Sequence, residues 1–435
     1  MNIARALLTF AMAGSLHAAE PSFATVDAAL TQAKKAHTPL LLDFTAPWCY
    51  SCYFMATHVL NGTEWNALEA KAVIATVDAD SPDGAAWMQK LAIKALPAYV
   101  VLNEDGVELG RILAEQPREK FYPMIDRIIA GASTLDGFKS KAAAGSLDAV
   151  AAVLGAYQAR DDGNGGLDWY QSLPRSVRDH AEKDARITLW RDRLDLARAT
   201  QAKDDAGIVS AAQRVLAGDI GCDRPYVIDP MLAASEKQAH SARIALLKPQ
   251  RAALEHMLVH DVFVTKPACA DERSIVIAIA DVDAALGDAK GEKAVLDLAI
   301  ESVQQQLQQL GNRLERDRNA ADNLRVYLMR AKRIEELDAL YSQLIAAYPD
   351  DYVYPYRYGK SLLERGNAAA ALPLLEKAAD KAYGVNRLAV AMQRVKALKA
   401  LKRQSDADKV VADVLEQNGQ WFPEQVAQLR AALKS

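Results

Sequence analysis

The pattern of apolar and polar residues divides the chain into a first part with strand and helix signals and a longer part with helix signals alone. The apolar run at residues 40–44 is short and leads into a turn, which is typical of a buried strand. A second run, at residues 98–102, precedes an Asn-Glu-Asp-Gly turn at residues 103–106, which favours a hairpin. From Leu135 onward, alanine-rich helical periodicity predominates. The pattern therefore predicts an α/β domain followed by an all-α region.

Turn-forming residues mark the expected boundaries. The stretch at residues 131–134 closes the last helix of the first domain, which we therefore place at residues 20–134. The following region, residues 135–317, is expected to be all-helical. The breaks that divide it into helices of ordinary length lie at residues 161–166, 173–174, 218–221 and 287–291.

Small and apolar residues recur in helical pairs in the last part of the chain, residues 318–435. The clearest unit has Tyr358, Gly359 and Leu362 on one helix, Gly366 at the turn, and Ala371, Leu375 and Ala378 on the next helix. This pattern resembles tetratricopeptide repeats. Such units stack and present a concave surface for a peptide or a partner protein. A structural helical cap without a ligand is the alternative.

The sequence Cys49-Tyr50-Ser51-Cys52, soon after the first apolar run, carries the clearest chemical signal. If a helix begins at Cys49, Cys52 lies on nearly the same face, so the two sulfurs can form a short-loop disulfide. We expect Cys49 to be exposed, with a pKa lowered by the positive end of the helix dipole. Cys49 is then the nucleophile, and the shielded Cys52 resolves the mixed disulfide.

The surrounding residues resemble the thioredoxin superfamily over roughly residues 22–132. The features that carry the resemblance are Asp43 in the first apolar run, Trp48 directly before the cysteine motif, and Leu96-Pro97 before the second run. The resemblance implies that Asp43 is a buried carboxylate that takes the proton from the inner thiol. It also implies that Pro97 is a cis proline whose loop faces the dithiol, and that Trp48, Leu96 and Pro97 bind substrate.

Within the superfamily, the sequence is more similar to the periplasmic C-terminal domain of the membrane thiol:disulfide interchange protein DsbD than to cytosolic thioredoxins. Those domains similarly place a leucine before the proline. This resemblance favours reduction of client disulfides, with electrons supplied by a membrane reductase. Tyr50-Ser51 replaces the Gly-Pro of thioredoxin, and the residues between the cysteines tune the balance of thiolate against disulfide. The direction of exchange therefore stays open.

Metal sites and cysteine-hydrolase chemistry are disfavoured. A zinc site requires two further ligands at comparable spacing, and none lies near the cysteine motif. His256 and His260 are four residues apart on an expected helix, but Met257 stands where the zincin pattern requires glutamate. His58 lies on the opposite helix face from Cys49 and is not expected to act as its base. We expect no cofactor other than the redox-active disulfide.

Two further cysteines, Cys222 and Cys269, lie in the expected middle region. In an oxidising compartment an even count allows them to form a structural disulfide. Two buried free thiols are the alternative, because the sequence alone does not bring their backbones within bonding range.

Residues 1–19 have the layout of a secretory signal peptide. Arg5 is followed by an apolar stretch at residues 6–16 and by Ala18-Ala19. The stretch is shorter than the roughly 18 residues that a membrane span needs. The alternatives are an uncleaved tether or an N-terminal helix of the fold. We therefore expect a periplasmic or secreted mature protein.

Composition adds limits to this interpretation. The 435 residues suggest about three domains, and 51% hydrophobic residues suffice for sizeable cores. The 52 basic and 56 acidic residues are well mixed and give a net charge of −4. This balance argues against a nucleic-acid partner and against a polybasic membrane contact.

These observations predict a periplasmic thiol–disulfide oxidoreductase that acts on protein thiols or disulfides, with helical repeats that recruit or position clients. The competing hypothesis is a non-enzymatic scaffold or assembly protein of the cell envelope. In that case the helical repeats bind partners, and the first domain only binds extended segments.

Overall fold

The α/β part of the molecule is built on a mixed sheet. The computed structural model describes residues 23–131, 134–418 and 420–434, so the expected signal peptide at residues 1–19 lies outside the described residues. In the described part, the sheet has four strands in the order β2-β1-β3-β4. They are β1 (Leu40–Thr45), β2 (Val73–Asp78), β3 (Ala98–Leu102) and β4 (Glu108–Leu113). β1 is parallel to β2 and antiparallel to β3, and the expected hairpin joins β3 to β4.

Helices cover both faces of this sheet. They are α1 (Val26–Ala36), α2 (Tyr50–His58), α3 (Gly62–Glu69), α4 (Pro82–Lys90) and α5 (Arg118–Gly131). Alternation along β1 sends Leu40, Leu42 and Phe44 into a core with α1 and α4. Leu41 points to the other face and packs with residues of α2, α3 and α5. Asp43 shares that second face, so its carboxyl group lies on the α2 side of the sheet.

The rest of the chain is helical. The middle region contains α6 (Leu135–Ala143), α7 (Leu147–Gln158), α8 (Gly163–Ser172), α9 (Arg175–Ala181), α10 (Ala185–Ala202), α11 (Asp205–Ala217), α12 (Arg224–Ala234), α13 (His240–Met257), α14 (Glu272–Leu286) and α15 (Ala289–Gln309). Short turns η1 (Gly221–Asp223), η2 (Leu258–Val262) and η3 (Leu314–Arg316) join some of them. The last part contains α16 (Arg318–Arg330), α17 (Ile334–Ala347), α18 (Val353–Glu364), α19 (Ala368–Ala379), α20 (Gly384–Ala400), α21 (Gln404–Asn418) and α22 (Pro423–Lys434). The all-α expectation for this part of the fold is confirmed.

Neighbouring helices in the last part pack as pairs. α16 contacts α17, α18 contacts α19, and α20 contacts α21. On α18, a Cβ atom at Gly359 would lie only 2.8 Å from Leu375 Cγ of α19, so glycine allows the two helices to approach. The arrangement is consistent with a helical-repeat part, and its assignment to tetratricopeptide repeats stays a prediction.

Large apolar cores run through the helical region. Their buried residues fall within residues 142–194, 196–354 and 362–429. The second core crosses the expected division between residues 317 and 318, so that division rests on the sequence pattern alone.

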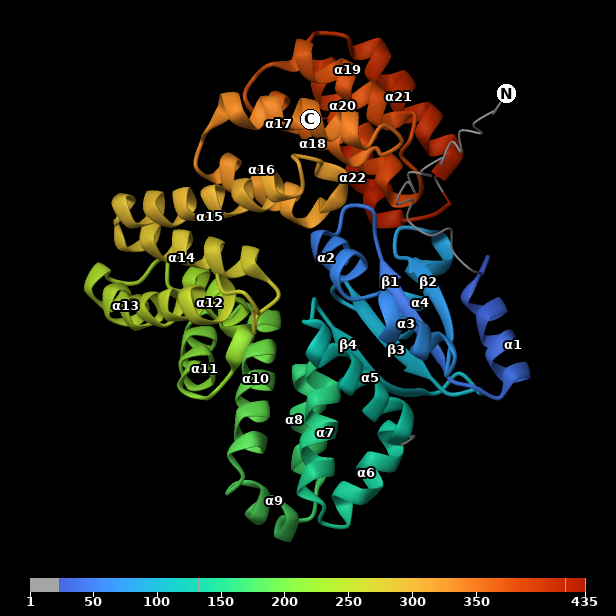
Figure 1. Ribbon diagram of the computed structural model, residues 1–435, viewed down its shortest axis with the longest axis vertical. Coiled ribbons are helices and arrows are strands. Elements are labelled where there is room, and N and C mark those ends of the chain that lie inside the picture. Colours follow the sequence, from blue (N-terminus) through green and yellow to red (C-terminus); the bar gives the residue numbers. More distant parts are fainter. Residues whose placement is uncertain (1–22, 132–133, 419, 435) are drawn as a thin grey trace, which may run out of the picture.

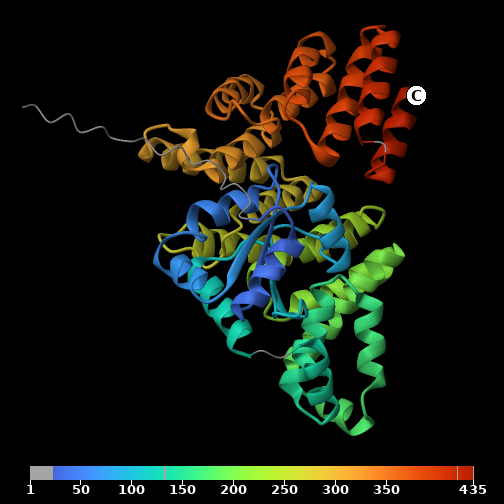
Figure 2. The ribbon, with the colours of Figure 1, turned by 90° about the vertical axis from the view of Figure 1, so that its right-hand side faces the viewer.

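The helical region wraps around the α/β domain. In Figure 1, α6 to α9 lie below the domain, α10 to α15 lie along its left side, and α16 to α22 lie above it. Figure 2, turned by 90°, shows the same order from bottom to top. α16 packs directly on α2, so the helical region reaches the end of the domain that carries the cysteine motif. In the described part of the chain, no helix combines the length and apolar character needed to cross a membrane.

Candidate redox site

Cys49 and Cys52 form a disulfide at the N-terminus of α2. The Sγ atoms are 2.00 Å apart, and the Cα atoms are 5.2 Å apart. Cys49 is the N-cap residue of α2, and the backbone N–H of Cys52 donates to its Sγ atom at 3.1 Å. A negative charge on Cys49 would therefore lie at the positive end of a helix, next to a backbone donor. This arrangement allows reversible thiol–disulfide exchange.

Asp43 lies on β1, on the face of the sheet that α2 covers, and is paired with Tyr99. Its side chain is buried, and this burial raises the pKa of the carboxyl group to about 7. A carboxyl group that titrates near neutral pH is suited to accept and return a proton. The structure thus provides a candidate base on the cysteine side of the sheet.

The Leu96–Pro97 peptide bond is cis. Leu96 packs against a small apolar cluster that contains Cys49 and Cys52, so this loop lies against the disulfide. Trp48 is 41% exposed, and its Nε1–H donates to Asp80 at 2.7 Å. The structure therefore brings together the residues that the sequence associates with substrate binding.

The expectation of an exposed Cys49 is wrong for this structure. Cys49 is only 4% exposed and Cys52 only 7%. The physical reason is that α16 packs on α2, where the Asn319 side chain donates to the Tyr50 carbonyl. The sequence pattern of the first domain contains no information about this cover, because the covering residues lie more than 260 positions later.

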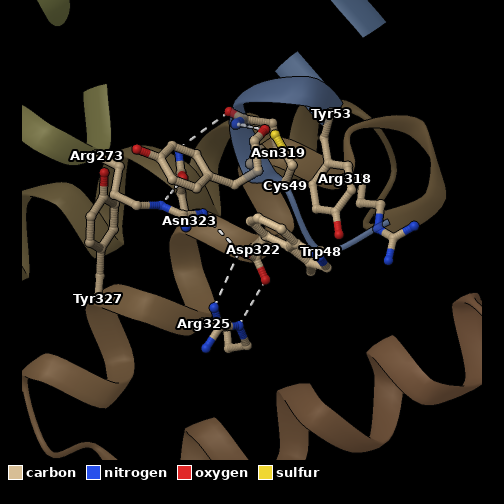
Figure 3. Close-up of polar contacts among 12 residues, drawn as sticks. Trp48, Cys49, Tyr53, Arg273, Arg318, Asn319, Asp322, Asn323, Arg325 and Tyr327 are labelled. Atoms are coloured by element: carbon tan, nitrogen blue, oxygen red, sulfur yellow. Dashed lines mark hydrogen bonds and ion pairs between the residues drawn. The ribbon is translucent and has the colours of Figure 1, made fainter. Parts of the chain in front are cut away.

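Polar side chains of the helical region hydrogen-bond to the backbone of the cysteine motif. The Arg357 guanidinium donates to the Trp48 carbonyl at 2.8 Å. The Asn319 amide donates to the Tyr50 carbonyl at 2.9 Å, and Figure 3 shows Asn319 beside Cys49. These bonds occupy backbone acceptors on both sides of Cys49. The helical region therefore holds the motif in place as well as covering it.

The loop after β2 makes a further contact with the helical region. Asp80 accepts hydrogen bonds from Trp48 and, at 2.8 Å, from the Asn386 amide of α20. Gly384 has a φ of +52°, and a Cβ atom there would lie 2.0 Å from the Asp80 carbonyl oxygen. Only glycine fits this close approach without a shift of the backbone.

Arginines of the helical region stack on the tyrosines of the motif. The Arg273 guanidinium lies 3.7 Å from the ring centroid of Tyr50, and Arg318 lies 4.2 Å from that of Tyr53 (Figure 3). The Tyr50 hydroxyl also donates to Asp271 at 3.2 Å. Cation–π contacts of partly desolvated groups stabilise such an interface.

Asp322 is the centre of the charge cluster beneath these contacts. It is fully buried and accepts hydrogen bonds from Arg273 at 2.9 Å, Arg325 at 2.8 Å and Arg357 at 2.6 Å. Burial alone would raise the pKa of Asp322, but the three arginine charges hold it well below its ordinary value. Figure 3 shows Arg325 and Asp322 below the motif. This cluster fixes Arg357 and Arg273 relative to the cysteines.

Sequence reasoning missed this polar interface. The residues concerned are Asp80, Arg273, Arg318, Asn319, Asp322, Arg357 and Asn386. Charged and amide residues crowd the start of α16, where a repeat helix would bury apolar residues, and this was the available signal. The pattern indicates buried polar contacts but does not identify the part of the chain that they contact.

Cys222 and Cys269 are joined by a second disulfide, with an S–S distance of 2.07 Å. It links η1 to the segment before α14. Lys120 of α5 donates to the Ala268 carbonyl at 2.9 Å, so this disulfide lies next to the α/β domain. His256 and His260 stack on each other with their ring centroids 4.0 Å apart. Among the described residues, no cluster of three or more His, Cys, Asp or Glu side chains could hold a metal ion.

Comparisons with known proteins agree with this geometry. Residues 26–129 match the model of a family described as thioredoxin-like domain. A thioredoxin H-type of Chlamydomonas reinhardtii is 37% identical over 87 residues, which cover 20% of this chain and 73% of that protein. A thioredoxin H-type of Oryza sativa subsp. indica is 28% identical over 108 residues, which cover 25% of this chain and 84% of that protein.

The thiol:disulfide interchange protein DsbD of Neisseria meningitidis is also similar. It is 30% identical over 102 residues, which cover 22% of this chain. The match spans only 17% of the length of DsbD. The four-stranded sheet, the cis proline and the disulfide at the start of α2 all lie within the matched residues 26–129. Through residues 26–129, this chain belongs to the thioredoxin-like family of thiol–disulfide oxidoreductases.

Proposed function

We propose that this chain is a periplasmic thiol–disulfide oxidoreductase that reduces disulfides in client proteins through Cys49 and Cys52. The observation that carries the proposal is the disulfide at the N-terminus of α2, with the cis Leu96–Pro97 loop packed against it. Similarity to thioredoxins and to a thiol:disulfide interchange protein supports protein thiols and disulfides as the substrates.

The reaction proceeds in two exchanges. The Cys49 thiolate attacks one sulfur of a client disulfide, the client S–S bond breaks, and the other client sulfur leaves as a thiolate that takes up a proton. Asp43 then accepts the proton of Cys52, whose sulfur attacks Cys49 and releases the second client thiol. Two electrons have passed to the client, and the Cys49–Cys52 disulfide that the structure contains is the product.

The proposed direction requires a source of electrons. A further dithiol must reduce the Cys49–Cys52 disulfide before the next cycle. We assign this role to a membrane reductase, on the basis of the similarity to DsbD. The periplasmic location rests on the expected signal peptide and agrees with a second disulfide at Cys222 and Cys269, because such bonds persist in oxidising compartments.

Access to Cys49 depends on the helical region. A residue that is 4% exposed presents too little surface for a protein disulfide to approach in line. In our proposal, α16 and α18 withdraw from Trp48 and Tyr50 when a client binds, and the helical pairs from α16 onward position that client. The arginine and asparagine contacts to the motif are then exchanged for contacts with the client backbone.

The function is tested by reduction of insulin or a model peptide disulfide with the full chain. We expect activity in the native chain, none with Cys49→Ser, and a trapped mixed disulfide with Cys52→Ser, because only the resolving thiol is missing. A double variant, Cys222→Ser with Cys269→Ser, is the matched control and should retain activity. Activity of the Cys49→Ser variant equal to that of the native chain would refute the assignment.

A scaffold or assembly role is the second candidate, and the burial of Cys49 is the observation that favours it. The two functions differ in what Cys52→Ala captures in cells. An oxidoreductase forms covalent complexes with clients that are released by a reductant. A scaffold retains its partners without a disulfide, and its partners are unaffected by substitution of Cys49.

A further inference from the structure

Glu115 is a second buried carboxylate beside the dithiol, in the segment after β4. It is 7% exposed, and its Oε2 atom has no hydrogen-bond partner. Its two neighbours in the chain fix its position. The Ala114 amide donates to the Pro97 carbonyl at 3.0 Å, and the Gln116 amide contacts the Met55 sulfur of α2 at 3.3 Å. Glu115 therefore lies between the cis-proline loop and the helix that carries the cysteines.

The pKa of Glu115 also responds to the motif itself. The Ser51 side chain, which stands between the two cysteines, lowers it. The charges of Glu115 and Asp43 both act on Tyr99, whose hydroxyl group has no hydrogen-bond partner. Two buried carboxyl groups, one on β1 and one after β4, therefore lie near Tyr99.

The charged groups that face Glu115 come from the start of α14. Asp271 and Glu272 repel a negative charge on Glu115, and Arg273 attracts it. Burial is the largest influence and raises the pKa of Glu115 to about 8, with a further increase from Asp271 and an opposing effect of the Ser51 hydrogen bond. The motif contributes Tyr50, whose own pKa is raised mainly by burial and by Asp271, with a smaller contribution from the charge of Glu115. Glu115 therefore carries its proton at neutral pH and loses it in mildly alkaline solution.

We propose that Glu115 holds the second proton of the redox cycle while Cys49 remains a thiolate. The inference rests on the proposed function. When a dithiol reduces the Cys49–Cys52 disulfide, its two S–H bonds and the S–S bond of this chain break, and a disulfide forms in the reductant. Two electrons pass to the Cys49 and Cys52 sulfurs. Above about pH 8, where Glu115 is ionised in the disulfide form, Cys52 takes one proton and Glu115 takes the other, so the charge of the site does not change.

Electrostatics explains why the proton goes to Glu115. An ionised Glu115 and a Cys49 thiolate would be two like charges in one buried site, and such pairs disfavour each other's ionisation. Protonated Glu115 removes this repulsion and retains a proton close to Ser51. Asp43 remains free to serve Cys52.

The test measures how the redox equilibrium depends on pH. The full chain and its Glu115→Gln variant are equilibrated in glutathione buffers from pH 6.5 to 9.5, and the oxidised fraction is read by acid quenching, alkylation and mass spectrometry. At pH 6.5 the oxidised fractions of the two chains should be equal, because the carboxylic acid of Glu115 and the amide of the variant are both neutral. Above about pH 8 the native chain should become harder to reduce than the variant, by up to about tenfold per pH unit, since one more proton is taken up.

Two further variants separate this role from a structural one. Ser51→Ala keeps the carboxyl group of Glu115 but removes the side chain that lowers its pKa. The oxidised fraction of this variant should therefore diverge from that of Glu115→Gln at a higher pH than the native chain does. Glu119→Gln changes an exposed carboxylate four residues along and should match the native chain. Coincident curves for native and Glu115→Gln up to pH 9.5 would overturn the proposal. A native disulfide that does not exchange with glutathione at any pH would instead overturn the proposed function.

Discussion

The guanidinium group of Arg357 donates a hydrogen bond of 2.8 Å to the carbonyl oxygen of Trp48, 309 residues earlier in the chain. The same side chain pairs with the buried Asp322. A backbone atom next to the redox-active Cys49 is thereby tied to the charge cluster of the helical region. Reactivity of the dithiol and packing of the helices are therefore linked properties, and substitutions in the helical region should change the chemistry at Cys49.

Substitution of Arg357 by alanine should make Cys49 more reactive. The change removes a hydrogen bond from a charged donor, an interaction of about 1.5–3 kcal/mol, and leaves Arg273 and Arg325 to neutralise Asp322. We expect reduced Cys49 to react with a maleimide about tenfold faster, because 1.4 kcal/mol corresponds to a factor of ten. Lys360→Ala, at an exposed position one turn along α18, is the control. Equal rates for all three chains would contradict the linkage.

A methyl group at residue 384 should loosen the same interface from the other side. In Gly384→Ala the new Cβ atom meets the Asp80 carbonyl at 2.0 Å, so the loop after β2 and α20 must separate. We expect faster alkylation of Cys49 and earlier proteolytic cleavage of the helical region. Gly366→Ala is matched, because its φ is also positive, at +80°, but its Cβ atom would meet nothing within 4 Å. An equal effect of both substitutions would assign it to backbone strain alone.

Asp43 should make the stability of the chain depend on pH. Its pKa is about 7 in the folded chain against 3.8 for an ordinary aspartate, so the folded state binds more protons between pH 4 and 7. The free energy of unfolding therefore falls as pH rises through this interval and is level above it. Asp43→Asn removes the effect and should stabilise the chain at pH 8 by at most about 4 kcal/mol, with little change at pH 4.

Urea unfolding at the two pH values measures the effect of Asp43→Asn. A variant that is no more stable than the native chain at pH 8 would show that the carboxylate is compensated when ionised. The same variant should also resolve mixed disulfides more slowly, because Cys52 loses its base.

Loss of the second disulfide should affect stability and spare the redox reaction. The Cys222–Cys269 bond closes a loop between residues separated by 47 positions. A bond of this span contributes about 2–4 kcal/mol by restricting the unfolded chain. We expect the double serine variant to unfold at lower urea concentration, with unchanged reduction of insulin. An unchanged unfolding midpoint would show that the loop is already constrained without the bond.

Much of the first domain could be predicted from the sequence because its signals are local. The alternation around Asp43 indicates a buried strand, and the spacing of Cys49 and Cys52 indicates adjacent sulfurs. Both signals depend on residues that lie only a few positions apart in the sequence. The hairpin at residues 103–106 is likewise specified by its own turn residues, which hydrogen-bond within the loop.

The exposure of Cys49 could not be predicted in the same way. It depends on where α16 and α18 lie. Nothing in the sequence around Asn319 and Arg357 identifies the backbone of the cysteine motif as their hydrogen-bond partner. Helical periodicity identifies which face of a helix is buried but not against which element. Glu115 was missed for a related reason, because a single glutamate after a strand has no distinctive spacing and becomes notable only once Ser51 is placed beside it.

The distance in sequence between Trp48 and Arg357 also sets an order of events. Whether it leaves a ribosome or a membrane channel, the chain presents its N-terminal part first, and such domains fold as units. The thioredoxin-like domain can therefore form while α16 to α20 are still to come. During that interval the new dithiol is not covered by α16 and α18 and can react with oxidants and other thiols. Once these helices have packed, Cys49 and Cys52 are buried in the oxidation state, dithiol or disulfide, that they have reached by then.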